Sequence, residues 1–150
     1  MTLLTPRTAT VALSVLMVLS LAACATGSPA NSEGPAASGG LMGITWQWSG
    51  GTTSNPTSQH VVPNPENYTI TFNADDTFNA QADCNQVSGA YTAGSDGAMS
   101  ITPGPSTLAA CPEASLGDLF VTQLTAASSW RIDGSTLTIT DADGATMQFD

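Results

Sequence analysis

Cys24 has the most specific chemistry in the sequence. It ends the run Leu21-Ala22-Ala23-Cys24, in which a branched residue and two small residues precede a thiol. A lipoprotein signal peptidase requires this pattern: the sulfur receives a diacylglyceryl group, the chain is cut before the cysteine, and the new amino group is usually acylated. Two or three acyl chains anchor a protein firmly. We therefore expect lipidation at Cys24; the alternative is an ordinary secretory cut near Ala23, which leaves a free thiol.

Cys84 and Cys111 are the two other cysteines. In a chain exported to an oxidising compartment, an even pair predicts a disulfide. That bond would restrict the unfolded chain by roughly 3.5 kcal/mol. The alternative is a nucleophilic cysteine with a histidine base. The one histidine, His60, lies in a Pro- and Asn-rich stretch, residues 50–65, which we interpret as a mobile loop with no orienting partner for the imidazole. The residues favour the structural disulfide.

Two groups of carboxylates have spacings that could form sites. Asp141-x-Asp143-Gly144 resembles part of a calcium loop, but it lacks the third oxygen ligand and the distant glutamate. The pair Asp75 and Asp76 could serve glycosidase-like chemistry in a cleft. A turn is the simpler interpretation of both groups. We predict no catalytic residue, no cofactor and no metal site, and we do not expect an enzyme.

Trp46, Trp48 and Trp130 are candidates for a ligand pocket, because aromatic side chains often line such pockets. All three also fall in runs with strand periodicity. Burial in the core is therefore the default expectation, and a pocket for a small molecule is the alternative.

The segments around Cys24 agree with export. Residues 11–21 form an apolar run too short to cross a bilayer of ~30 Å as a helix, so residues 1–23 are interpreted as a lipoprotein signal peptide. Residues 24–40 comprise the lipidated cysteine and small, polar residues that bury too little apolar area to fold, which predicts a flexible tether. The remaining residues, 41–150, fit one domain with its own core.

The charge of the chain after Cys24 limits its partners. This part of the chain contains twelve acidic residues and one basic residue, Arg131, which gives it a formal charge of −11. The sequence contains no lysine. Binding a phosphate backbone needs several basic side chains, so nucleic acid is excluded as a partner. The acidity also argues against docking on anionic lipid, which leaves the acyl chains on Cys24 as the membrane contact. We expect an exported protein, lipid-anchored at the cell membrane or envelope.

Alternating apolar and polar residues predict short strands through most of the domain. One face is shared by Ile44, Trp46 and Trp48, and another by Tyr68, Ile70 and Phe72. Residues 68–72 and 77–82 are expected to form one hairpin, and residues 88–92 and 99–102 a second. Three further runs end the chain, marked by Trp130 and Ile132, by Leu137 and Ile139, and by Met147 and Phe149.

One segment follows a helical period instead. Leu116, Leu119, Phe120, Leu124 and Ala127 fall on one stripe, and Ser115 three residues before Asp118 resembles a capping box. We expect one helix over residues 115–127. The fold class is therefore mainly β, within α+β: a small curved antiparallel sheet or a partly closed, lipocalin-like barrel with one helix.

Three segments of the domain carry a family resemblance: residues 82–91 (ADCNQVSGAY), 107–113 (TLAACPE) and 130–139 (WRIDGSTLTI). They resemble the META domain, an HslJ-like family formerly classed as a domain of unknown function, although Asp83 stands where the family usually has glycine. The resemblance implies a small envelope domain of lipocalin-like topology, often lipid-anchored or secreted and associated with heat or envelope stress. It implies no enzyme activity and no cofactor.

Two functions are expected from these observations. The first is a lipid-anchored, non-catalytic accessory or protein-binding factor in envelope or heat-stress homeostasis. The alternative is a lipocalin-like carrier of a small molecule in a pocket lined by Trp46, Trp48 and Trp130. A buried apolar cavity would favour the carrier, whereas a filled core with an exposed apolar patch would favour a protein partner.

Overall fold

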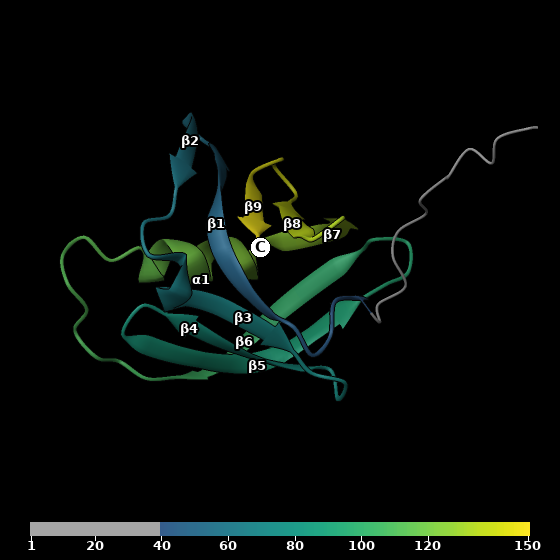
Figure 1. Ribbon diagram of the computed structural model, residues 1–150, viewed down its shortest axis with the longest axis horizontal. Coiled ribbons are helices and arrows are strands. Elements are labelled where there is room, and N and C mark those ends of the chain that lie inside the picture. Colours follow the sequence, from purple (N-terminus) through teal and green to yellow (C-terminus); the bar gives the residue numbers. More distant parts are fainter. Residues whose placement is uncertain (1–39) are drawn as a thin grey trace, which may run out of the picture. The chain divides into compact units, whose positions relative to one another are not determined.

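Residues 40–150, which the computed structural model describes, form nine β-strands, a short 3-10 helix and one α-helix (Figure 1). The signal peptide, Cys24 and nearly all of the tether lie outside these described residues. The strands are β1 (Thr45–Ser54), β2 (Thr57–Val61), β3 (Tyr68–Phe72), β4 (Thr77–Ala82), β5 (Asn85–Ala93), β6 (Met99–Ser106), β7 (Ala127–Asp133), β8 (Thr136–Asp141) and β9 (Thr146–Phe149). The 3-10 helix η2 is Pro65–Asn67, and the helix α1 is Gly117–Thr125.

The strands form one antiparallel sheet in the order β6-β5-β4-β3-β1-β9-β8-β7, with β2 paired to β1 outside this path. The two outermost strands approach each other at an isolated bridge between Ala98 and Ser129, beside which the Trp130 N–H donates to the Gly97 carbonyl at 2.8 Å. The sheet therefore curls into a half-barrel, with α1 packed beside it (Figure 1). This confirms the predicted fold class.

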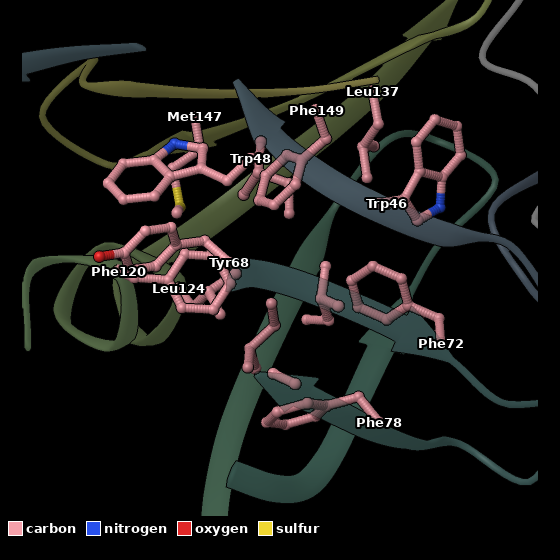
Figure 2. Close-up of a cluster of buried hydrophobic side chains, with 14 of the residues drawn as sticks. Trp46, Trp48, Tyr68, Phe72, Phe78, Phe120, Leu124, Leu137, Met147 and Phe149 are labelled. Carbon is pink, nitrogen blue, oxygen red and sulfur yellow. The ribbon is translucent and has the colours of Figure 1, made fainter. Parts of the chain in front are cut away.

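The concave face of the sheet holds the core, which Figure 2 shows in close-up. Because strand side chains alternate between faces, every second residue of β3 and β4 is buried. Phe120 and Leu124 of α1 join this cluster from the helix. The fully or almost fully buried side chains include Trp48, Ile70, Phe72, Phe78, Phe120, Leu137, Ile139, Met147 and Phe149. Both predicted hairpins and the three C-terminal strands are confirmed.

The prediction of a loop over residues 50–65 is wrong, because most of this stretch forms a further hairpin that the sequence did not predict. β1 continues to Ser54 and pairs with β2, with Gly51 opposite His60. Polar and small residues fill β1 beyond Trp48 and most of β2, so no alternation of apolar residues predicts a strand there. Hydrogen bonds between β1 and β2 hold this hairpin together, and the hydroxyl oxygens of Thr53 and Ser58 lie 2.8 Å apart across the two strands.

Two local details also differ from expectation. Ile44 was expected on the same strand face as Trp46 and Trp48, but it precedes β1 and is 44% exposed. The chain turns at Gly43, which has a φ of +75°, and Leu41 is the residue of this segment that is fully buried. The helix is shorter than predicted and begins without a capping box, since its N-cap is Leu116 and no side chain caps it. Ser115 accepts a hydrogen bond from the Gly117 N–H at 3.1 Å. Within the described residues, no helix has both the length and the apolar character needed to cross a membrane.

Candidate functional site

A cleft of about 590 Å³ opens between α1 and the loop that follows β6. We call it the loop–helix cleft. Its volume falls within the ~300 to 1,000 Å³ common for ligand sites. The inward-facing Ala82 and Val87 form its buried floor. Its other lining residues are Asn85, Ser106, Thr107, Leu108, Ala109, Ala110, Cys111, Pro112, Glu113, Ser115, Gly117, Asp118, Val121 and Thr122.

Asn85, at the start of β5, holds the loop wall of the cleft. Its side-chain oxygen accepts hydrogen bonds from the Ala109 N–H at 2.7 Å and the Thr107 hydroxyl at 3.0 Å. Its amide nitrogen donates to the Ala109 carbonyl at 3.1 Å and to the Cys111 sulfur at 3.3 Å. A side-chain amide has both a donor and an acceptor, so one asparagine can bind both polar groups of a single loop residue. Asn85 thus replaces strand pairing where β6 has ended.

A disulfide between Cys84 and Cys111 closes the same wall, with 5.5 Å between the two Cα atoms. Cys84 is exposed and Cys111 is half-buried. The pair predicted from the sequence is thus brought together, and it joins the β4–β5 turn to the segment that leads into α1. Because the bond lies at the cleft, it fixes the position of a binding wall as well as restricting the unfolded chain.

The helix wall is positioned from the sheet. The Leu116 N–H, just before α1, donates to the hydroxyl of Tyr68 in β3 at 3.0 Å. Gly117 begins the helix against β4, where an added Cβ would lie 3.0 Å from the Ala82 carbonyl oxygen. A larger residue at 117 would push the helix away from the sheet. Phe120 is fully buried against Trp48, with ring centroids 5.4 Å apart, and anchors the next turn.

The rim of the cleft combines acidic and apolar groups. Glu113 on the loop and Asp118 on α1 are both exposed, and no basic residue lines the cleft. Leu108 is 93% exposed at the loop wall, which is unusual for a large apolar side chain. Arg131 instead lies exposed on β7, with its guanidinium 4.0 Å from the Asp133 carboxylate.

The three tryptophans, for which a ligand pocket was the alternative to the core, lie among the buried core residues. Their exposed fractions are 3% for Trp46, 0% for Trp48 and 3% for Trp130. The Trp46 indole N–H donates to the Leu41 carbonyl at 3.0 Å. Trp48 contacts Tyr68 and Phe120 edge-on or tilted, as Figure 2 shows. None of the three lines the loop–helix cleft.

His60 lies on β2 with its ring edge-on to Trp48, at 5.2 Å between centroids. Its Nε2 atom is buried and has no hydrogen-bond partner in the described part of the chain. Burial lowers the pKa of the imidazole below its ordinary value, because it penalises the charged form. The histidine does not line the loop–helix cleft, whereas Cys111 does.

The two carboxylate groups form turns. Asp141 accepts hydrogen bonds from the N–H groups of Asp143 and Ala145 at 2.8 and 2.9 Å, between β8 and β9. Asp75 accepts from the Thr77 hydroxyl at 2.6 Å and the Thr77 N–H at 3.3 Å, and these hydrogen bonds lower the pKa of its carboxyl. Residues 40–150 contain no group of three or more histidine, cysteine or acidic side chains placed to hold a metal ion.

Sequence reasoning missed the cleft itself and the roles of Asn85 and Tyr68. Asn85 follows Cys84 directly, so the family-like motif contained it, but an asparagine next to a cysteine gives no sign of which loop it binds. Tyr68 was recognised as a core residue of a strand. Its hydroxyl binds a residue 48 positions away in sequence, which no local pattern encodes.

Comparisons with known proteins agree with this architecture. The family model described as META domain matches residues 41–150. A protein from Burkholderia xenovorans, solved by NMR, has a similar fold, with a TM-score of 0.64 and 20% identity over 77% of this chain and 86% of its own. A DUF4847 family protein from Bacteroides vulgatus is similar with a TM-score of 0.53 and 19% identity, over 75% and 94% of the two chains. No curated protein matches the chain.

Proposed function

Because the chain belongs to the META domain family, we propose that it is a lipid-anchored, non-catalytic protein of the cell envelope that binds a partner protein through the loop–helix cleft. Acyl chains on Cys24 would hold it at the membrane, and residues 25–40 would let the domain reach its partner. Its role would be that of an accessory factor in envelope or heat-stress homeostasis.

The cleft is the single observation that carries this proposal. It is a large hollow with a buried apolar floor and the exposed Leu108 at its rim, walled by segments that Asn85, Tyr68 and the disulfide hold in place. Fixing the walls in advance reduces the conformational entropy lost on binding. Leu108 adjoins the apolar floor of the hollow, so a partner seated there would remove both from water.

A binding role is favoured over catalysis by the placement of the reactive groups. The cysteines of the domain are joined to each other, and the His60 ring packs on Trp48. The residues that line the cleft include two acidic side chains, Glu113 and Asp118, but no histidine and no lysine.

The alternative of a small-molecule carrier depended on a pocket lined by tryptophans. Trp46, Trp48 and Trp130 are instead in contact with other core residues. Their burial among other core side chains favours the cleft as the place of contact.

Site-specific photo-cross-linking in the native envelope tests the proposal. A photoreactive phenylalanine analogue would replace Thr122, which is exposed on α1 and lines the cleft. The matched control replaces Ser100, which is exposed on β6 outside the cleft. We expect a discrete cross-linked protein product from position 122 only. Equal products from both positions, or lipid products only, would contradict a protein partner at the cleft.

A further inference from the structure

Building on the proposed function, we infer that the occupant of the loop–helix cleft is an extended protein segment carrying a basic side chain next to an apolar one. The inference concerns the chemistry of the partner and rests on three separate features of the cleft: its charge, its apolar surface and the free backbone of its loop wall.

The charge of the cleft selects for a cation. Glu113 and Asp118 lie on opposite walls, one on the loop and one in the first turn of α1. No basic side chain lines the cleft, and the described residues contain only Arg131, which lies beside Asp133 on β7. The two carboxylates therefore have no positive partner within the domain. An anionic segment would be repelled by them and by the acidic surface as a whole, whereas a lysine or arginine would be attracted.

The apolar surface of the cleft selects for a hydrophobic neighbour of that cation. Ala82 and Val87 are buried at the floor, Val121 is half-buried on α1, and Leu108 is almost fully exposed on the loop. A side chain inserted between these residues would remove apolar area from water on both walls. Burying such area is favourable and would add to the affinity for the segment.

The loop wall favours a peptide over a small organic cation. Asn85 occupies the N–H and the carbonyl of Ala109, but the backbone groups of its neighbours Leu108 and Ala110 make no hydrogen bond among the described residues. Free backbone groups along a wall that lacks strand pairing can pair with the backbone of an added extended segment. A small amine has no row of backbone groups to offer them.

Peptide binding to the mature lipidated chain tests this inference. The chain is placed in phosphatidylcholine nanodiscs, and empty nanodiscs supply the background. The probe is a fluorescein-labelled peptide with blocked ends, Ser-Gly-Lys-Leu-Lys-Val-Ser-Gly. Two comparison peptides replace both lysines by glutamate, or leucine and valine by serine. We expect saturable binding of the first peptide only, weakening as ionic strength rises because salt screens the ion pairs.

Matched variants locate the binding. Glu113→Gln with Asp118→Asn should weaken the affinity for the peptide by roughly three- to tenfold. Asp96→Asn with Asp143→Asn makes the same change in net charge at two exposed turns outside the cleft and should leave the affinity unchanged. Equal weakening in both pairs would reduce the effect to non-specific attraction and overturn the inference. Displacement of the peptide by butylamine at an equal concentration would also overturn it, because a small cation would then suffice.

The two proposals fail in different ways. If a protein cross-links at position 122 but the affinity for the peptide does not depend on Glu113 and Asp118, the cleft binds a protein of other chemistry and only the inference falls. If the peptide binds as expected but no protein cross-links in the envelope, the recognition chemistry stands and the proposed cellular role falls.

Discussion

The hydroxyl of Tyr68, in the middle of the sheet, accepts a hydrogen bond of 3.0 Å from the backbone N–H of Leu116, immediately before α1. Tyr68 is only 4% exposed, and the hydrogen bond is partly buried. It couples the start of the helix wall to β3 and thereby positions one side of the loop–helix cleft.

Tyr68→Phe should lower the free energy of unfolding by about 1 kcal/mol, because it removes a hydrogen bond and leaves the Leu116 N–H without its partner. Urea denaturation measures the loss, and amide exchange at Leu116 should become faster. Tyr91→Phe is the control, since the Tyr91 hydroxyl donates to the Asn73 carbonyl at 2.8 Å, away from the helix. Faster exchange at Leu116 in the Tyr91 variant as well would show that the effect is not local.

Asn85→Ala should release the loop wall of the cleft, because the Ala109 backbone and the Thr107 hydroxyl lose their common partner. We expect destabilisation of roughly 1 to 2 kcal/mol and rapid amide exchange at Ala109, measured by NMR. Asn79→Ala, at an exposed position of β4, should change neither. Retained protection of the Ala109 amide in the Asn85 variant would contradict the assigned role.

Replacing both cysteines of the domain, Cys84→Ser with Cys111→Ser, should lower the free energy of unfolding by roughly 3.5 kcal/mol through the loss of loop closure. For a domain of this size the melting temperature would fall by roughly 10 to 20 °C. The unreduced protein purified from the envelope should show no titratable thiol at either position. Two titratable thiols in that sample would reject the bond.

The pH dependence of stability should carry a contribution from His60. Burial lowers the pKa of its imidazole below the ordinary value of 6.5, so the unfolded chain takes up a proton at a higher pH than the folded one. The contribution is therefore complete above pH 6.5 and is lost as the pH falls from there through the lowered pKa. His60→Gln should flatten the stability profile over this window. An NMR titration of His60 at or above 6.5 would show the sign to be wrong.

Cys24→Ala should release the protein from membranes, because the acyl chains are the proposed anchor. Intact-mass analysis of the unaltered protein should show acyl additions on a chain that begins at Cys24. The test is fractionation of cells into membrane and soluble parts, with Cys84→Ser as a control that keeps the lipidation signal. Recovery of an unmodified chain beginning at Cys24 would refute the prediction.

The sequence by itself determined most of the strands, the mainly β fold class and the family. Alternating apolar residues in β3, β4 and the C-terminal strands predicted which side chains are buried, because the period of a strand is a local property. The same pattern did not predict β2 or the part of β1 that follows Trp48. These segments consist mainly of polar and small residues, and backbone hydrogen bonds pair them without any alternation of apolar side chains.

Tertiary structure alone decided the candidate site. The loop–helix cleft exists because the curl of the sheet brings Tyr68, Asn85 and the segment from Leu108 to Asp118 together, and the contacts of Tyr68 and Asn85 span 48 and 24 positions in sequence. The same curl buried Trp46, Trp48 and Trp130, which by residue type alone were equally suited to a pocket. A local sequence pattern predicts which face of a strand a side chain occupies. A cleft depends on how elements distant in sequence pack together, and the packing of the whole core determines that arrangement.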